Sequence, residues 1–240
     1  MRVACAAAAQ ILKTVAALVE PGRSTKELDD VAGELIANFG GKSPFLGYKG
    51  YPGSICVSVN DEVVHGIPGK RRMQYGDIVS LDVGIVLDGF VGDNATTVPV
   101  GLVVPRTQEL LRVTEQALRA AIAQARDGRR VGDISHAVQA IVEANGFSVV
   151  REFVGHGVGR KMHEDPQIPN YGRAGEGPKL KPGMTLAIEP MINAGGSAVQ
   201  MLSDGWTVVT ADGSPSAHFE HTVLVTEGEP EILTWPKKSP

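Results

Sequence analysis

Two aspartates, Asp82 and Asp93, lie in two apolar, β-branched-rich runs that are separated by Asp88-Gly89. An Asp-Gly pair between such runs predicts a two-residue hairpin turn. With this turn Asp82 faces Ala95, and Asp93 shares the face of Ala95 because side chains alternate along a strand. The carboxylates are then diagonal neighbours about 7–8 Å apart at the backbone, and they could hold two cations roughly 3.5–4 Å apart. Two unrelated aspartates on a solvated sheet face would give the same pattern.

Two glutamates in predicted strand regions are further candidates for a functional site. Glu189 follows the apolar run Leu186-Ala187-Ile188, where a buried carboxylate without a partner would be costly. An acid at an exposed strand end is the alternative. Glu220 alternates with His218 and Thr222 along one face of a predicted strand, and that face could equally be solvated.

Three histidines are also candidate site residues. One is flanked by glycines, and the other two stand at the entrances of loops. His156 is flanked by glycines in Gly155-His156-Gly157, and these permit close approach to its ring. His65 precedes Gly66-Ile67-Pro68 and His163 precedes Glu164-Asp165-Pro166. Taken singly, each could be a structural or an ordinary surface histidine.

Considered together, four acids and one histidine form a set of hard oxygen ligands with one borderline nitrogen. They are Asp82, Asp93, Glu189, Glu220 and His156. Such a set suits Mn, Fe, Co or Zn rather than a thiolate site. Four carboxylates without a metal would repel one another, and two divalent ions would neutralise them. A carboxylate-bridged cation pair can bind and polarise water for hydrolysis.

The elements that must position these residues follow an order of two helices and then strands, which occurs twice. Apolar periodicity predicts helices at residues 2–20, 24–39, 105–127 and 133–146. Ser24 and Glu27 form a capping box, Pro105 opens the third helix, and Asp133 is expected to cap the fourth.

Strands are expected at residues 54–60, 62–66, 78–87, 90–97 and 149–154, with a long loop from about 156 to 182 and a later hairpin around 211–214. Gly76 and Gly183 precede Asp82 and Glu189 by the same spacing, with an apolar strand between. This suggests an internal duplication that places the two acids equivalently about a pseudo-twofold axis. We therefore expect one catalytic domain over residues 1–240, with halves at about 1–101 and 102–235. The tail 236–240 is expected to fray.

The composition of the 240-residue chain is that of a globular protein, with 42% hydrophobic and 21% charged residues. A net charge of −4 argues against a general binder of nucleic acid or anionic membranes. Two cysteines, Cys5 and Cys56, imply no disulfide framework and a reducing compartment. Residues 3–9 imitate a signal peptide, but Gln10 and Lys13 interrupt the apolar run. We expect a cytoplasmic protein.

In their order and spacing, the four acids and His156 resemble the five metal ligands of the type 1 methionine aminopeptidases. The resemblance extends over nearly the whole chain, and so many matched segments in one order are highly specific. The matching segments are Leu46-Gly47-Tyr48, Tyr51-Pro52, Val63-Val64-His65-Gly66-Ile67-Pro68, Gly155-His156-Gly157-Val158-Gly159, Lys181-Pro182-Gly183-Met184, Ile188-Glu189-Pro190, Asp204-Gly205-Trp206-Thr207 and Phe219-Glu220-His221-Thr222.

The resemblance implies an α+β, duplicated pita-bread fold. Its two pseudo-twofold-related halves would form a curved antiparallel sheet covered by four helices. The implied activity is removal of the initiator methionine from nascent proteins when the second residue is small, by a monomer working near the ribosome without binding nucleic acid or membranes. The implied cofactors are two divalent metal ions, which could be Co, Mn, Fe or Zn.

Residue roles are also implied by the resemblance. Asp93 and Glu220 would bridge the two metals, Asp82 would complete one of them, and His156 and Glu189 would complete the other. Glu189 would in addition relay the proton of the attacking water.

Two further histidines and a pocket for the methionine side chain complete the implied site. His163 would donate a hydrogen bond to the developing oxyanion, and His65 would contact the scissile amide. Aromatic and sulfur-bearing walls suit a thioether side chain. The implied wall residues are Phe45, Tyr48, Tyr51, Cys56, Met162 and Trp206.

This chain departs from the family pattern at several points. Some relatives have Cys in place of Phe45 and Phe in place of Met162, which affects the size of the pocket. Relatives also begin with a short segment before the equivalent of Met1, so we expect the first helix to be weakly anchored. An Xaa-Pro aminopeptidase or dipeptidase shares the fold and metal set but carries a whole domain before the catalytic one. A non-catalytic peptide-binding relative would be expected to have lost ligands.

Overall fold

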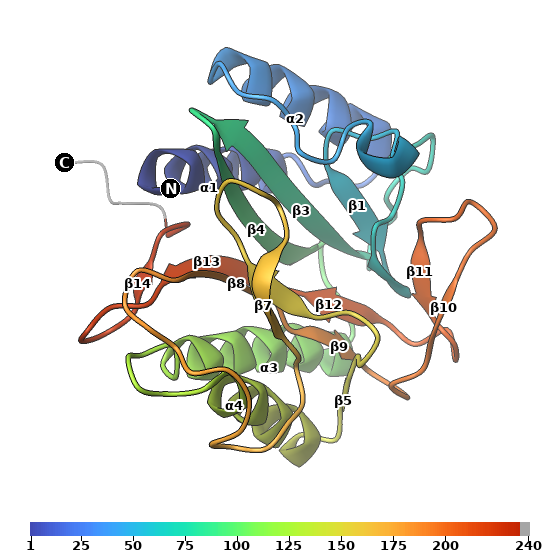
Figure 1. The fold of residues 1–240 in the computed structure, drawn as a ribbon. Coiled ribbons are helices and arrows are strands. Elements are labelled where there is room, and N and C mark those ends of the chain that lie inside the picture. Colours follow the sequence, from blue (N-terminus) through green and yellow to red (C-terminus); the bar gives the residue numbers. More distant parts are fainter. Residues whose placement is uncertain (236–240) are drawn as a thin grey trace.

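A computed structural model describes residues 1–235; the predicted fraying of the tail 236–240 lies outside these described residues. Strands lie between two pairs of helices, as Figure 1 shows. The first pair is α1 (Arg2–Ala16) and α2 (Thr25–Asn38), and the second is α3 (Pro105–Ile122) and α4 (Val131–Ala144). This is the predicted α+β arrangement of an antiparallel sheet covered by four helices. No helix within residues 1–235 is long and apolar enough to cross a membrane.

One eight-stranded antiparallel sheet forms the centre of the molecule. Its strands follow the order β1 (Cys56–Val59), β3 (Ile78–Leu87), β4 (Phe90–Pro99), β13 (Glu220–Leu224), β8 (Thr185–Ile188), β6 (Gly155–Gly157) and β7 (Glu164–Ile168), and β14 (Glu231–Ile232) pairs with β13. Two three-stranded sheets adjoin it: β10 (Val199–Met201), β11 (Val208–Thr210) and β2 (Glu62–Val64), and β12 (Ser216–His218), β9 (Met191–Asn193) and β5 (Ser148–Val149). The loop between α2 and β1 contains the short 3-10 helix η1 (Tyr48–Gly50).

The β3–β4 hairpin has the predicted turn and register. Asp88 and Gly89 have φ values of 51° and 76°, and a type I′ turn requires positive φ at both central residues. Asp82 pairs with Ala95 as predicted. The turn chemistry at two residues therefore fixes which side chains of both ten-residue strands face the same way.

The helices agree with the predicted order and differ at some ends. Serine 24 caps α2 with the predicted capping box, in which Glu27 Oε2 accepts a hydrogen bond of 2.7 Å from the Ser24 backbone N–H. The assignment of Asp133 as the cap of α4 is wrong. The helix begins at Val131, and the Asp133 carboxylate reaches back to accept from the Arg130 backbone N–H at 2.8 Å. A carboxylate at the third helical position can satisfy an N-terminal donor as well as a cap residue can.

Three strand predictions in the second half of the chain are wrong. The strand expected at 149–154 is only Ser148–Val149, because after Val150 donates to the Met191 carbonyl the chain turns toward β6. The region expected to be a loop at 156–182 holds most of β6 and all of β7. β6 is one histidine between two glycines, and β7 contains a proline, so neither carries a strong strand signal. The hairpin near 211–214 lies instead at Asp204-Gly205, between β10 and β11. Residues 211–214 carry the chain to β12 in another sheet.

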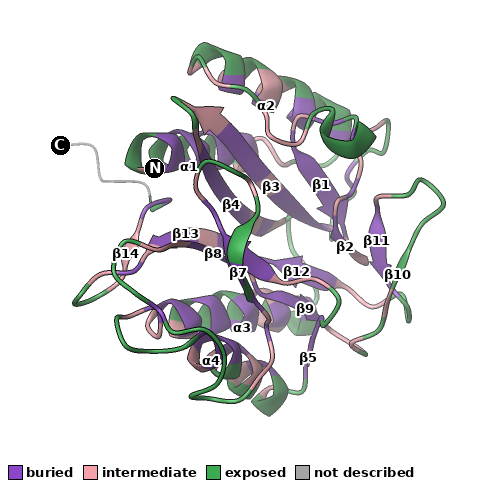
Figure 2. Cartoon of the chain, viewed as in Figure 1, coloured by how far each residue is buried: buried purple, intermediate pink, exposed green. Residues whose placement is uncertain are grey.

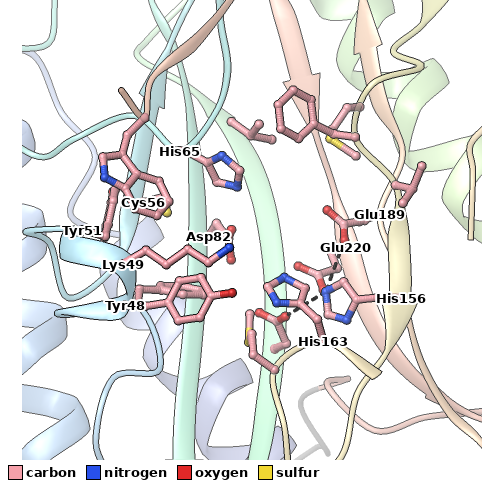
Figure 3. A pocket seen from close by; sticks show the side chains of 18 residues that line it. Tyr48, Lys49, Tyr51, Cys56, His65, Asp82, His156, His163, Glu189 and Glu220 are labelled. Atoms are coloured by element: carbon pink, nitrogen blue, oxygen red, sulfur yellow. Dashed lines mark ion pairs between the residues drawn. The ribbon is translucent and has the colours of Figure 1, made fainter. Parts of the chain in front are cut away.

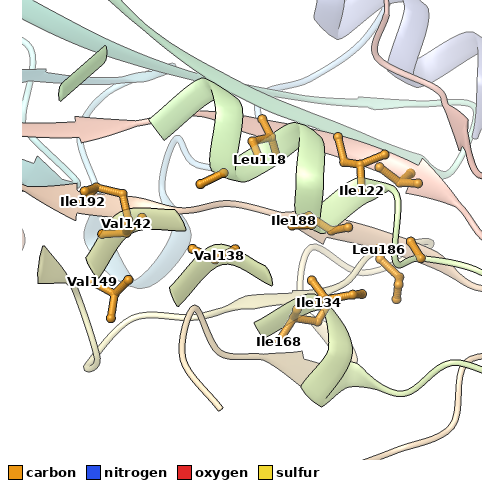
Figure 4. Packing of buried hydrophobic residues seen from close by; sticks show 14 of the residues in the cluster. Leu118, Ile122, Ile134, Val138, Val142, Val149, Ile168, Leu186, Ile188 and Ile192 are labelled. Atoms are coloured by element: carbon orange, nitrogen blue, oxygen red, sulfur yellow. The ribbon is translucent and has the colours of Figure 1, made fainter. Parts of the chain in front are cut away.

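Each half contributes its own apolar core. One cluster lies beneath α1 and α2, and the other lies beneath α3 and α4. Figure 4 shows the second cluster, with Leu118 and Val138 facing Ile188 of the sheet. Figure 2 shows buried faces turned toward the sheet and exposed faces turned outward. Ile11 and Val15 of α1 are fully buried, so the first helix is packed well into its core, and its weak anchoring stays a prediction about opening in solution.

Candidate metal centre and active site

Five adjacent strands each bring one of the predicted metal ligands to the same region of the main sheet. Figure 3 shows four of them converging from their strands. In the order of the strands, the residues are Asp82 on β3, Asp93 on β4, Glu220 on β13, Glu189 directly after β8, and His156 on β6.

Strand register accounts for the convergence of the carboxylates. Ala95 of β4 pairs with Asp82 on one side and with Glu220 on the other. Asp93 lies two residues from Ala95 and therefore on the same face. Three acids from three neighbouring strands thus surround one small alanine, which leaves space above it.

The imidazole of His156 lies beside this carboxylate group. Its Nε2 is 3.8 Å from Asp93 Oδ2 and 3.5 Å from Glu189 Oε1. Candidate ligand atoms of Asp93, His156 and Glu220 all lie within 4.8 Å of one another. These distances describe a site in which one nitrogen and several oxygens could share a divalent cation.

The carboxyl groups are unfavourably placed without a cation. Asp93 and Glu220 are each 2% exposed, and burial followed by repulsion from neighbouring carboxylates raises the pKa of both groups well above the ordinary range. Burial also raises the pKa of Asp82 to about 7. Asp82 Oδ1, Asp93 Oδ1 and Glu220 Oε1 are buried without a hydrogen-bond partner among the described residues. Such orphaned oxygens are costly, and divalent cations are the partners that they fit.

A cavity of about 290 Å³ opens above the carboxylates. All thirteen predicted site residues line this cavity, including the six proposed for the methionine pocket. Tyr51 is fixed in the wall because its hydroxyl donates to the Gly66 carbonyl at 2.8 Å. Trp206 meets the Tyr51 ring edge-on, with centroids 5.1 Å apart. The wall opposite the acids is therefore aromatic and rigidly held.

The two further predicted histidines point into the cavity from different loops. His65 packs edge-on against Phe153 and Trp206, and burial lowers its pKa to about 4. The His163 ring lies 4.5 Å from that of His156, and burial followed by repulsion from His156 lowers the pKa of His163. In both cases the surroundings favour the neutral imidazole, which has one N–H that can donate a hydrogen bond.

Several residues around the cavity were missed by the sequence reasoning. His218 lies behind Glu189, and its Nε2 is 3.3 Å from Glu189 Oε2. Its alternation with Glu220 was a signal that could have identified it. His218 itself does not line the cavity. The lining residues that the sequence reasoning did not name as site residues are Lys49, Val64, Phe153, Val154 and Met191.

Comparison of the sequence with known proteins gives consistent matches. The sequence model of metallopeptidase family M24 matches residues 1–227. The chain is 56% identical over 216 residues to methionine aminopeptidase 1 of Bacillus subtilis (strain 168), covering 90% of this chain and 87% of that protein. It is 45% identical over 236 residues to the methionine aminopeptidase of Escherichia coli (strain K12), covering 98% of this chain and 89% of that protein.

Solved structures give the same result. The crystal structure of the methionine aminopeptidase from Thermotoga maritima matches with a TM-score of 0.96 at 50% identity, covering 98% of this chain and 94% of that chain. The prolidase from Pyrococcus horikoshii OT3 matches with a TM-score of 0.78 at 20% identity, covering 99% and 61%. The second likeness concerns the fold alone. Together they identify the duplicated pita-bread fold that the sequence predicted.

Proposed function

Because the chain belongs to metallopeptidase family M24 and, within it, to the methionine aminopeptidases, we propose that it removes the N-terminal methionine of polypeptides through the residues of this cavity. It is a hydrolase that depends on divalent metal. The observation that carries the assignment of residues is the group of buried, unpaired carboxyl oxygens facing an aromatic wall.

Two divalent ions, drawn from Co, Mn, Fe and Zn, are proposed to occupy the carboxylate site. Asp93 and Glu220 would lie between the two ions, Asp82 would hold one, and His156 with Glu189 would hold the other. Candidate ligand atoms of Asp93 and Glu220 lie within 4.8 Å of each other on the neighbouring strands β4 and β13, and this placement supports the shared position. When bound, divalent ions in such a site supply Lewis acidity, which activates water near neutral pH and polarises a carbonyl group.

Glu189 is proposed to move the proton during hydrolysis. Its carboxylate would accept a proton from the attacking water and deliver it to the departing amine of the second residue. Its place beside His156, with Oε1 3.5 Å from the imidazole, supports this role because the carboxylate lies at the edge of the ligand group and lines the cavity.

His163 and His65 are proposed to act as neutral hydrogen-bond donors. His163 would donate to the carbonyl oxygen on which negative charge develops, and an aimed donor of this kind acts mainly on the transition state. His65 would contact the scissile amide. The low pKa of both groups supports these roles, because each imidazole keeps a neutral donor and adds no positive charge near the substrate amine.

The aromatic wall is proposed to receive the methionine side chain. Thioether sulfur makes favourable contacts with aromatic rings, and Tyr51 and Trp206 present such rings. The proposed wall also includes Phe45, Tyr48, Cys56 and Met162. His65 and His163 narrow the space beyond the scissile bond, so the second residue of the substrate should be small.

We also propose that the enzyme works as a cytoplasmic monomer, in one domain, on nascent chains near the ribosome. Cys5 and Cys56 are both free and buried, which fits a reducing compartment. A net charge of −4 gives no electrostatic reason for direct contact with nucleic acid.

A peptide panel tests the proposed activity and site. Protein stripped with a chelator and then supplied with Mn, Fe, Co or Zn should cleave Met-Ala-Ser and leave Met-Leu-Ser nearly intact. Stripped protein, checked by elemental analysis, should be inactive, and full activity at that point would refute the metal site. Faster cleavage of Ala-Pro-Ser would favour the Xaa-Pro alternative, which the 20% identity to prolidase does not support.

A further inference from the structure

His218 is a buried imidazole that the proposed mechanism does not use. It is the last residue of β12 and is 1% exposed. Its Nε2 lies 3.3 Å from Glu189 Oε2 but makes no regular hydrogen bond with any described residue. It is not among the residues that line the cavity. The imidazole therefore contacts the Glu189 carboxylate on the side that faces away from the cavity.

The backbone of His218 is held firmly in place. Thr97 Oγ1 donates to the His218 carbonyl at 2.8 Å and accepts from the His218 N–H at 2.9 Å. The Ser80 hydroxyl lies 2.8 Å from the same Thr97 oxygen. In addition, His218 pairs with Met191 in the β12–β9 ladder. The point from which the imidazole projects is thus fixed relative to β3, β4 and the strand that follows Glu189.

Glu189 lies between two imidazoles. Its Oε1 faces His156 at 3.5 Å, and its Oε2 faces His218 at 3.3 Å. Its main chain is fixed separately, because Asn170 Nδ2 donates to the Glu189 carbonyl at 3.0 Å. With the main chain anchored, the remaining freedom of Glu189 is the rotation of its side chain, and His218 is the group on the far side that can set this rotation.

Packing alone gives a poor reason for an imidazole at this position. A buried polar nitrogen without a good partner costs free energy, and an apolar side chain of similar size would fill the space without that cost. Hydrogen bonds of catalytic groups often tighten when substrate binds. A distance of 3.3 Å to a carboxylate oxygen is therefore compatible with a hydrogen bond that forms fully in the working enzyme.

We propose that His218 is a positioning residue that acts through Glu189, its Nε2–H donating to Oε2 so that Oε1 stays turned toward the ligand group. The inference rests on the proposed function, in which Glu189 is both a metal ligand and the proton acceptor. Groups that orient metal-binding side chains typically contribute about 10–100-fold in metal affinity or activity.

Two substitutions separate the hydrogen bond from the volume of the side chain. His218→Gln keeps an N–H donor, whereas His218→Leu keeps a similar volume without a donor. His221→Gln is the matched control, because this half-buried histidine of β13 lies on the opposite face and bonds to Thr234. All three proteins would be prepared metal-free and titrated with Mn²⁺ by calorimetry, then assayed on Met-Ala-Ser.

In His218→Leu, we expect kcat and Mn²⁺ affinity to fall roughly 10–100-fold, with KM changed less than about threefold because the residue does not touch substrate. His218→Gln should stay within about threefold of wild type in both measurements. The thermal midpoint of His218→Leu should equal or exceed that of the wild type, which would separate positioning from folding. Crystals of His218→Leu should show the Glu189 carboxylate in more than one rotamer.

Wild-type kcat and Mn²⁺ affinity in His218→Leu would overturn the inference. An equal loss in His221→Gln would also overturn it, because the effect would then be a general disturbance of the strands. If the wild type failed to cleave Met-Ala-Ser, the proposed function would fail, while the Mn²⁺ affinities and the Glu189 rotamer would still decide the role of His218.

Discussion

Replacing Asp82 by Asn should stabilise the metal-free protein at pH 7, although Asp82 is a proposed ligand. Its Oδ1 is buried without a hydrogen-bond partner among the described residues. Burial, reinforced by the charge of Glu189 and opposed by His218, raises the pKa of this carboxyl group to about 7 from an ordinary value of 3.8. A neutral amide of nearly the same shape avoids the cost of keeping a charge there.

The size and sign of the effect follow from the pKa. An acid whose pKa is higher in the folded state binds its proton more tightly there, so folding stability falls as pH rises from the unfolded pKa to the folded one. One pKa unit corresponds to about 1.4 kcal/mol, so the shift to about 7 gives at most about 4 kcal/mol at pH 7. The figure is an upper bound because the Asp82 side chain partly faces the cavity. At pH 4 the folded protein carries a protonated Asp82, and the advantage of Asn should nearly vanish.

Only the difference in the free energy of unfolding between Asp82→Asn and the wild type isolates the contribution of Asp82. Burial lowers the pKa of His65 and of His221 to about 4. A histidine with a lowered folded pKa loses stability as pH falls from its unfolded value near 6.5 through the folded value. Both histidines therefore destabilise the acidified protein, in opposition to Asp82. Their contributions are common to both proteins and cancel in the difference.

Urea unfolding of chelator-stripped wild type and Asp82→Asn at pH 4, 5, 6 and 7 measures the effect. The variant should gain stability relative to wild type as pH rises. Saturating Mn²⁺ should narrow the difference at pH 7, since a ligand that binds only the folded state at about 100 times its dissociation constant adds about 2.7 kcal/mol and the variant should gain less than the wild type. A difference that does not change with pH, or a stability gain from Mn²⁺ that is equal in both proteins, would refute the reasoning.

Three further substitutions test the catalytic roles and the packing that supports them. Glu189→Gln should lower kcat by roughly 10²–10⁴-fold because the proton acceptor is lost, and near-wild-type kcat would assign the proton to another group. His163→Ala should lower kcat roughly 10²–10³-fold with full metal content, and a parallel loss of metal by elemental analysis would make His163 a ligand. Gly92→Ala should lower the urea midpoint, because a Cβ there would lie 2.3 Å from the Ala4 carbonyl oxygen of α1. Such overpacking typically costs about 1–3 kcal/mol. Gly228→Ala is the control and should change the midpoint little, because the space around Gly228 is open.

Much of the first half of the fold could be predicted from the sequence because its signals are local. The turn at Asp88 and Gly89 requires backbone conformations that Asp and Gly accept, and it fixed the register of β3 and β4 and the shared face of Asp82 and Asp93. The capping box at Ser24 acts over three residues. Turns and helix caps of this kind depend only on residues a few positions apart, so they can be predicted without tertiary information.

The short strands of the second half could not be predicted in the same way. β6 and β7 form because their backbone groups pair with β8 and with each other. β6 shows no alternation of apolar and polar residues, since it consists of His156 between two glycines. β7 alternates over only four residues and contains a proline, which is a weak strand signal. The pairing of β6 with β8 joins segments that lie on either side of β7 and a long loop, so a short sequence window around β6 does not contain this partner.

The residue types and order of the site were determined by the sequence, and the tertiary structure decided how those residues meet. Residue types and their surroundings singled out seven of the thirteen predicted lining residues, and resemblance to a family supplied the six wall residues. The structure gathers all thirteen around one cavity. The place of His218 behind Glu189 depended on hydrogen bonds between the Thr97 hydroxyl and the main chain of His218, which are 121 residues apart. Buried backbone N–H and C=O groups must find partners wherever the fold supplies them, and at His218 the partner is the hydroxyl of Thr97. The contact between His218 and Glu189, from which we infer a positioning role, is therefore a product of the folded sheet.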